Sequence, residues 1–110
     1  MIQKLDHGYI VNINKPQEWS SFGVVKKIRG ITGIKKVGHA GTLDPFATGV
    51  LLICLGKATK KVSELMNQPK EYEGILTLGQ ITDTLDPTGK IIAEKPVPDL
   101  EEQQILTVFR

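Results

Sequence analysis

Short apolar runs predict two strands in the first half of the chain, and a helical pattern follows the second of them. Residues 8–13 (GYIVNI) are rich in β-branched side chains, which is typical of a strand. Residues 50–55 (VLLICL) form a continuous apolar run, which favours a strand buried on both faces. Residues 57–66 have helical periodicity, and the apolar side of that helix would consist of Ala58, Val62 and Leu65.

A further helix is predicted between the two strands, after a turn at Pro16. Its buried face would be formed by residues at i, i+4 and i+7 spacing, namely Val24, Ile28 and Ile31. Either Ser20 or Ser21 is expected to cap it, because a serine oxygen can accept an otherwise unpaired backbone N–H. Gly30 is the expected stop, since helices commonly end at a glycine.

The last 40 residues predict a hairpin and a helix. Residues 71–79 alternate in polarity as a strand does, and residues 90–95 are expected to pair with them as the antiparallel partner. Asp99, with Glu102 three residues later, predicts a helix start resembling a capping box. The apolar face of this helix would consist of Ile105, Leu106 and Phe109. The helical pattern is unfinished at the last residue, so we expect this chain to be the front part of a longer protein.

The tetrapeptide TLDP occurs twice, at residues 42–45 and 84–87. In the second copy, Asp86 and Pro87 are followed by Gly89, the preferred pattern of a type I turn. It lies between two predicted strands, so a hairpin connection explains it. Asp86 is therefore predicted to have a turn-forming role only.

The first copy has no glycine at the corresponding position. Glycines at 38, 41 and 49 surround it instead, which indicates unusual backbone angles or a close approach to a ligand. The segment delivers His39 and Asp44 just before a predicted buried strand, a common setting for functional residues. From the residues alone, a tight structural loop and an active site both remain open.

The sequence does not support several other kinds of site. A phosphate-binding P-loop ending at Gly56-Lys57 would need glycine at position 51 and Ser or Thr at 58, where the chain has leucine and alanine. His39, His7 and the carboxylates have no recognised metal-ligand spacing. Cys54 lies in an apolar run and is interpreted as a core residue. The serine pair is better explained as a helix cap than as a hydrolase nucleophile.

Composition narrows the class of protein but not its function. The 110 residues are 40% hydrophobic and 24% charged, with a net charge of +2. Such a charge permits a polyanionic partner without demanding one, and the basic residues at 26–36 would ordinarily be a solvated surface. One cysteine and no long apolar run fit a cytoplasmic protein without a membrane segment or secretory signal.

The segment GHAGTLDPFATGVLLICLGKATK (38–60) closely resembles the central motif of the bacterial tRNA pseudouridine synthases of the B family. NKPQEWSSFGVV (14–25) and KEYEGILTLGQITDTLDPTG (70–89) match the family as well, with matching spacing. The resemblance implies a pseudouridine synthase-like core of α+β class. This core is a mixed, mainly antiparallel sheet with packed helices, incomplete in residues 1–110. It also implies isomerisation of uridine 55 in the tRNA T loop.

Within that resemblance, Asp44 is the catalytic aspartate. Its carboxylate would attack C6 of the uracil ring, or act at C1′ or on the C2′ proton, and both routes stay open. Tyr72 would stack on the flipped base, and His39 would enter the T loop. The residues with supporting roles would be Lys15, Pro16, Gly41 and Thr42. No metal, no cofactor and no obligate protein partner are implied, and the partner is the T-arm stem-loop of tRNA.

Members of this family are longer than this chain. The resemblance implies that the rest of the catalytic domain, including an arginine paired with the aspartate, and a C-terminal RNA-binding domain would follow. This chain alone is therefore expected to be inactive or weak. Two alternatives remain open: a non-catalytic RNA-binding or tRNA-folding module that retains the synthase core, and a fragment without a competent function.

Overall fold

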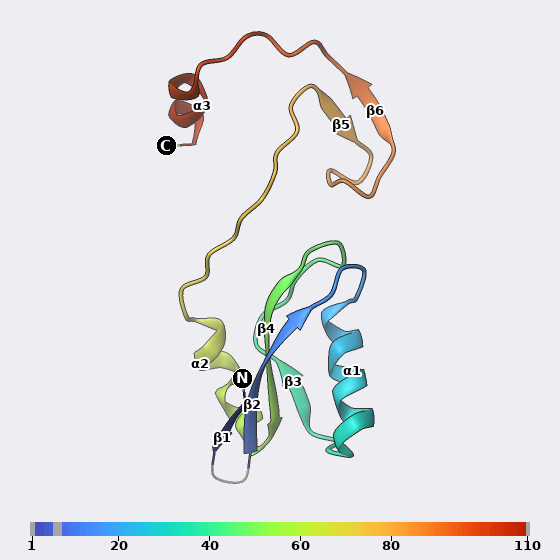
Figure 1. Ribbon diagram of the computed structural model, residues 1–110, viewed down its shortest axis with the longest axis vertical. Coiled ribbons are helices and arrows are strands. Elements are labelled where there is room, and N and C mark those ends of the chain that lie inside the picture. The colour runs from blue at the N-terminus through green and yellow to red at the C-terminus, as the bar shows by residue number, and fades with distance from the viewer. Residues whose placement is uncertain (1, 6–7, 110) are drawn as a thin grey trace. The chain divides into compact units, whose positions relative to one another are not determined.

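The computed structural model describes residues 2–5 and 8–109, in two compact units, Met1–Glu71 and Tyr72–Arg110 (Figure 1). The first unit contains a four-stranded sheet in the order β1 (Ile2–Leu5), β2 (Gly8–Lys15), β4 (Gly49–Gly56), β3 (Val37–His39). The second contains a hairpin of β5 (Gln80–Thr82) and β6 (Ile91–Glu94). Every described strand pair is antiparallel, so the predicted α+β class with a mainly antiparallel sheet is confirmed.

Strands β2 and β4 form the centre of the first sheet. They pair over their full lengths, from Gly8 opposite Gly56 to Lys15 opposite Gly49, so the two predicted strands are confirmed. One face of the sheet packs against α1 (Ser21–Thr32), and their buried core consists of Val24, Val25, Val37, Leu51, Ile53 and Leu55. Cys54 points to the other face and is also fully buried, whereas Val50 on that same face is 70% exposed, so the predicted burial of β4 on both faces holds at Cys54 but not at the start of the strand.

Helix α1 begins as predicted and ends later than predicted. Ser20 is the N-cap, and its Oγ accepts a hydrogen bond from the Gly23 N–H at 2.8 Å. The predicted stop at Gly30 is wrong, because the helix continues to Thr32 and is capped by Gly33, which adopts a φ of 71°. A glycine inside a helix costs only about 1 kcal/mol, whereas this left-handed cap satisfies the Arg29 carbonyl.

The predicted burial of Ile31 is also wrong. Ile31 is 70% exposed, whereas the buried side chains of α1 lie in its first two turns. The last turn therefore extends past the region where the helix packs on the sheet. Residues 57–66 are helical as predicted, but they form a 3₁₀ turn, η1 (Lys57–Lys61), followed by a short α2 (Val62–Met66).

The predicted strand at 71–79 is absent. Residues 71–77 have no regular structure, and residues 78–79 form a turn before β5 begins at Gln80. An alternating pattern makes a strand only where a neighbouring strand accepts its backbone hydrogen bonds, and the described residues provide none. The second predicted strand, near 90–95, exists as β6, but its antiparallel partner is β5.

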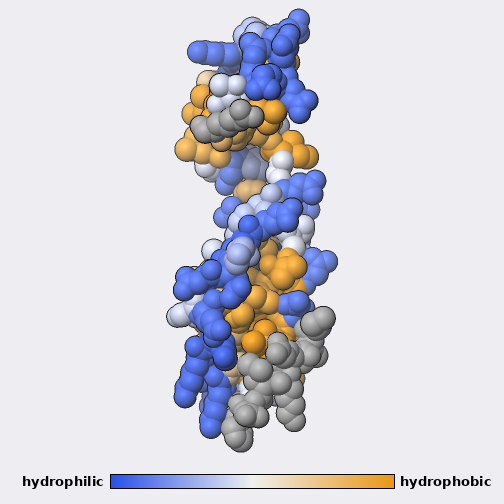
Figure 2. All heavy atoms as spheres, turned by 90° about the vertical axis from the view of Figure 1, so that its left-hand side faces the viewer, coloured by the Kyte–Doolittle hydropathy of each residue, from blue (hydrophilic) through white to orange (hydrophobic). Residues whose placement is uncertain are grey.

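The final helix, α3 (Glu102–Val108), is capped two residues later than predicted. Glu101 is the N-cap, and it exchanges side chain–backbone hydrogen bonds with Gln104, so the capping box is present but Asp99 is outside it. The predicted apolar face is present but not buried: Ile105, Leu106 and Phe109 are 39%, 43% and 72% exposed. Figure 2 shows apolar side chains (orange) on the surface of this unit, in the upper part of the view.

No helix among the described residues is both long enough and apolar enough to cross a membrane.

Candidate active site

Asp44 lies in the loop between β3 and β4, at residues 40–48. The Ala40 N–H donates to the Leu52 carbonyl at 2.9 Å, which ties the start of the loop to β4. The Ala47 N–H donates to the Asp44 carbonyl at 2.9 Å and closes a β-turn over Asp44–Ala47. The first TLDP copy therefore also forms a turn, without the glycine that the second copy has. The Asp44 side chain is exposed.

Lys15 holds the residue after Asp44. It ends β2 and is fully buried, and its ammonium donates to three backbone carbonyls: Trp19 at 2.7 Å, Pro16 at 2.9 Å and Pro45 at 3.1 Å. Burying an ammonium group is costly unless its N–H groups are satisfied, and these three acceptors satisfy all of them. Lys15 therefore fastens the Asp44 loop to the turn that follows β2.

The Pro45 carbonyl has a second donor in that turn. The Glu18 N–H donates to it at 2.5 Å, and Glu18 adopts a φ of 70°. A positive φ is uncommon for a residue other than glycine and costs about 1 kcal/mol or more. Glu18 is therefore strained in the same conformation in which its N–H bonds the Asp44 loop.

Ser21 holds the loop on the other side of Asp44. Its side chain is 96% buried (4% exposed) at the start of α1. The Ser21 Oγ accepts from the Leu43 N–H and from the Thr42 hydroxyl, both at 3.0 Å, and donates to the Leu43 carbonyl at 3.3 Å. This role was not predicted from the sequence, although only one of two adjacent serines can be the N-cap of a helix.

His39 and Gly41 contact each other at the start of the loop. The half-buried His39 ends β3, and its Nδ1 donates to the Gly41 carbonyl. Because a carbonyl can only accept, Nδ1 carries the proton, and Nε2 of a neutral ring remains an acceptor. Gly41 has a φ of 100°, a conformation that any side chain would strain.

The predicted site residues therefore fall into two groups. Those of the first unit lie around the Asp44 loop: Lys15 bonds Pro16 and Pro45, Ser21 bonds Thr42, and His39 bonds Gly41, whereas the Asp44 side chain takes part in none of these bonds. Tyr72 belongs to the second unit, where its side chain is 71% exposed. His7, which entered the metal-site comparison, lies outside the described residues.

In the second TLDP copy, the aspartate side chain forms hydrogen bonds within its own turn. Asp86 Oδ1 accepts from the Thr84 hydroxyl at 2.6 Å, the Thr88 N–H at 2.9 Å and the Thr88 hydroxyl at 2.5 Å. These bonds, from Thr84 first and then Thr88, lower the pKa of the Asp86 carboxyl. The predicted turn-forming role of Asp86 agrees with this geometry.

Two other sequence interpretations concern reactive groups. Cys54 is fully buried, and its burial raises the pKa of the thiol, as expected of a core residue and not of a nucleophile. Among residues 2–5 and 8–109, no group of three or more His, Cys, Asp and Glu side chains is arranged to hold a metal ion.

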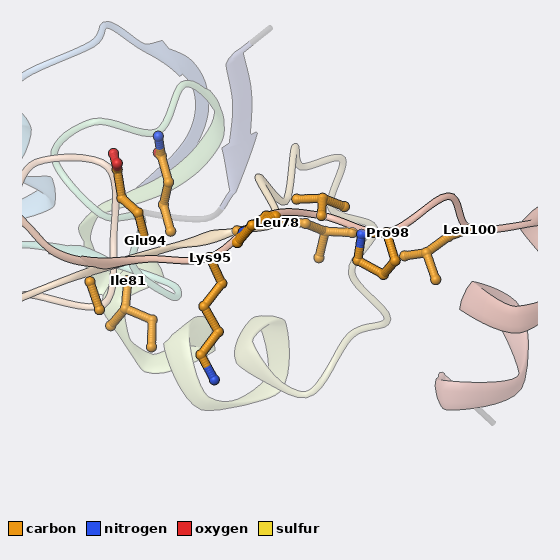
Figure 3. Close-up of a pocket in the computed structure, with 11 residues that line it drawn as sticks. Leu78, Ile81, Glu94, Lys95, Pro98 and Leu100 are labelled. Atoms are coloured by element: carbon orange, nitrogen blue, oxygen red, sulfur yellow. The ribbon is translucent and has the colours of Figure 1, made fainter.

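A separate hollow of about 360 Å³ lies in the second unit (Figure 3). It is lined by the ends of β5 and β6 and by the proline-containing segment up to Leu100. The labelled side chains around it are mostly apolar, and Glu94 and Lys95 point in opposite directions. None of the predicted site residues lines this hollow.

Comparison with known proteins identifies the family to which this chain is similar. The family described as TruB family pseudouridylate synthase (N terminal domain) matches residues 29–110. A tRNA pseudouridine synthase B of Clostridium tetani is 52% identical over 97 residues, which cover 88% of this chain and 34% of that protein. The enzyme of the same name from Desulfotalea psychrophila is 54% identical over 96 residues, covering 86% and 39%.

A third relative of that name, from Caldanaerobacter subterraneus subsp. tengcongensis, is 51% identical over 104 residues, 92% of this chain and 36% of the relative. The chain thus spans little more than a third of the length of these curated relatives. The matched region includes the whole 40–48 loop with Asp44. By the family match and these identities, the chain belongs to the TruB family of pseudouridylate synthases, in its N-terminal domain.

Proposed function

We propose that this chain is the N-terminal part of the catalytic domain of a cytoplasmic isomerase that converts uridine in tRNA, at position 55 of the T loop, to pseudouridine. The observation that carries the proposal is an exposed carboxylate, Asp44, on a loop held through its neighbours on both sides. The names of the relatives support the reaction and the tRNA substrate.

The reaction suits a single well-placed carboxylate. The N1–C1′ bond breaks, the base rotates, a C5–C1′ bond forms, and the proton on C5 is replaced by one on N1. Asp44 serves as the nucleophile at C6, or acts at C1′ or on the C2′ proton to release the base. No redox change and no transfer to a second molecule occur, so we propose a reaction without cofactor or metal.

The uridine must leave the folded T loop before it can react, which costs a few kcal/mol of unstacking. In the proposal, Tyr72 stacks on the flipped base and offers its hydroxyl. His39 enters the T loop, where its Nε2 is available as an acceptor because Nδ1 is bonded to Gly41. The remainder of the catalytic domain and a C-terminal RNA-binding domain complete the protein in this proposal.

The charge distribution of the first unit supports an RNA partner. Five of the 14 Lys and Arg residues lie between positions 19 and 43, and none of the 12 Asp and Glu residues does. Four of the five are exposed, namely Lys26, Lys27, Lys35 and Lys36. A basic segment of this kind suits the phosphates of an RNA stem, which proteins bind largely by shape and charge. No obligate protein partner is proposed.

The test is release of tritium from C5 of [5-³H]uridine in a T-arm stem-loop. The chain is assayed alone and as a chimera in which the remaining part of the Clostridium tetani relative follows it, each with and without Asp44→Ala. We expect release by the chimera, none after the substitution, and little or none by the chain alone, since it covers only a third of its relatives.

Release that persists in Asp44→Ala would contradict the assignment of Asp44. If the chimera binds the stem-loop but releases no tritium in either form, the proposed reaction is wrong and the RNA-binding or tRNA-folding module remains. Strong release by the chain alone would contradict only the expectation that it is weak.

A further inference from the structure

Ser21 uses all of its hydrogen-bonding capacity on the Asp44 loop. A serine hydroxyl has one donor and two acceptor positions, and Ser21 fills them with the Leu43 carbonyl, the Leu43 N–H and the Thr42 hydroxyl. It is not needed to cap α1, because Ser20 does so. This nearly fully buried hydroxyl therefore directs all of its hydrogen bonds to the two residues that precede Asp44.

The second TLDP copy indicates that Ser21 prevents a hydrogen bond between Thr42 and the Asp44 carboxylate. There, the threonine two residues before the aspartate donates its hydroxyl to the Asp86 carboxylate. In the first copy, the corresponding hydroxyl, that of Thr42, is taken by Ser21. No hydrogen bond to the Asp44 carboxylate is found among the described residues of the first unit, whereas Asp86 accepts three.

We infer that Ser21 is a positioning residue for Asp44: it fixes the loop through Leu43 and withdraws the Thr42 hydroxyl, so that the carboxylate stays free for the substrate. This inference rests on the proposed function of Asp44. Lys15 holds the loop from the other side through Pro45, so Asp44 lies between two fixed residues. A well-oriented group reacts faster because less freedom is lost at the transition state.

The matched pair Ser21→Ala and Ser20→Ala tests the inference. Both substitutions remove one serine hydroxyl at the start of α1, but the second removes the helix cap and leaves the loop network intact. In the chimera described above, single-turnover tritium release and the Kd for the T-arm stem-loop are measured for both, with Asp44→Asn as the inactive reference. In the 110-residue chain, NMR measures solvent exchange of the Leu43 and Gly23 amides.

The inference predicts that Ser21→Ala lowers the single-turnover rate constant at least tenfold relative to Ser20→Ala, while the two Kd values stay within threefold. The Leu43 amide should exchange faster only in Ser21→Ala, and the Gly23 amide only in Ser20→Ala. If Ser21→Ala does not fold, Ser21→Cys fills a similar volume with a weaker hydrogen-bonding group and must give the same pattern, to a smaller extent.

Equal rates in the two variants would overturn the inference, as would a loss explained entirely by weaker RNA binding. An unchanged Leu43 amide in Ser21→Ala would also overturn it. These results differ from failure of the proposed function: in that case either Asp44→Asn keeps the activity of the unsubstituted chimera, or the unsubstituted chimera itself releases no tritium.

Discussion

The two TLDP loops have the same four residues and use their aspartates in different ways. In the second loop, the Asp86 carboxylate accepts three hydrogen bonds from Thr84 and Thr88, and Leu85 adopts a φ of 61°. In the first loop, the turn is closed through the backbone of Asp44, whose carbonyl accepts the Ala47 N–H. The side chain of Asp44 takes no part in closing that turn.

Neighbouring residues account for the difference. The residue after the proline is Thr88 in the second loop and Phe46 in the first, so the first loop lacks one hydroxyl next to the aspartate. The other hydroxyl is diverted to Ser21, and Lys15 fastens the Pro45 carbonyl. Where residues distant in the sequence stabilise the turn, the aspartate carboxylate can remain free to act on a substrate. Where they do not, the carboxylate itself forms the hydrogen bonds that stabilise the turn.

Removing the buried ammonium should break the first loop most severely. Lys15→Met keeps the length of the side chain but removes the ammonium that bonds the Trp19 and Pro16 carbonyls, and leaves the Pro45 carbonyl with the Glu18 N–H as its one remaining donor. We expect the free energy of unfolding of the first unit to fall by about 2 to 4 kcal/mol, measured by urea denaturation of the chain. The control is Lys61→Met, which removes an exposed ion pair with Glu64 at 3.4 Å and should change stability by less than about 1 kcal/mol. Equal effects of the two substitutions would contradict the anchoring role of Lys15.

Adding a hydroxyl next to Asp44 should make the first loop resemble the second. Phe46→Thr places a donor where the second loop has Thr88, and Phe46→Val provides nearly the same shape without the hydroxyl. A hydrogen bond to the carboxylate that is absent in the transition state costs about 1.5 kcal/mol, so the threonine variant of the chimera should be about tenfold slower than the valine variant. Equal rates of tritium release would show that this hydroxyl does not capture Asp44.

The smallest expected effect concerns the pH dependence of the second loop. Hydrogen bonds from Thr84 and Thr88 lower the pKa of Asp86 below its ordinary value of 3.8. These bonds therefore favour the folded hairpin above pH 3.8, and their contribution is lost as the pH falls through the lower folded-state pKa. An NMR titration of the Thr88 amide should have its midpoint below 3.8; a midpoint at or above 3.8 would contradict the geometry of the turn.

The sequence predicted the first unit better than the second. Strands β2 and β4 and the start of α1 follow from apolar runs and a serine cap, because these segments pack on one another and their local preferences agree with the fold. The segment 71–79 alternates in polarity as a strand does but has no described strand beside it. The polarity pattern of a segment indicates which side chains it could bury. It does not indicate whether a neighbouring strand is present to pair with it.

The candidate site shows a similar limit. Asp44, His39 and Lys15 were found through a motif, and their roles remain predictions. The role of Ser21 in holding the loop could not be predicted, because its partners Thr42 and Leu43 are more than 20 residues away in the sequence. The only signal was a second serine at a helix start where one serine suffices as the N-cap.

The most direct test of the account compares Asp44→Asn with Asp86→Asn in the chimera. Both substitutions change the same residue in the same tetrapeptide and remove one negative charge. Initial rates of tritium release from the [5-³H]uridine T-arm are measured at equal fractions of folded protein. The account predicts that Asp44→Asn lowers the rate by about a thousandfold or more, and that Asp86→Asn stays within about threefold of the unsubstituted chimera. Comparable losses in both variants, or activity retained in Asp44→Asn, would contradict it.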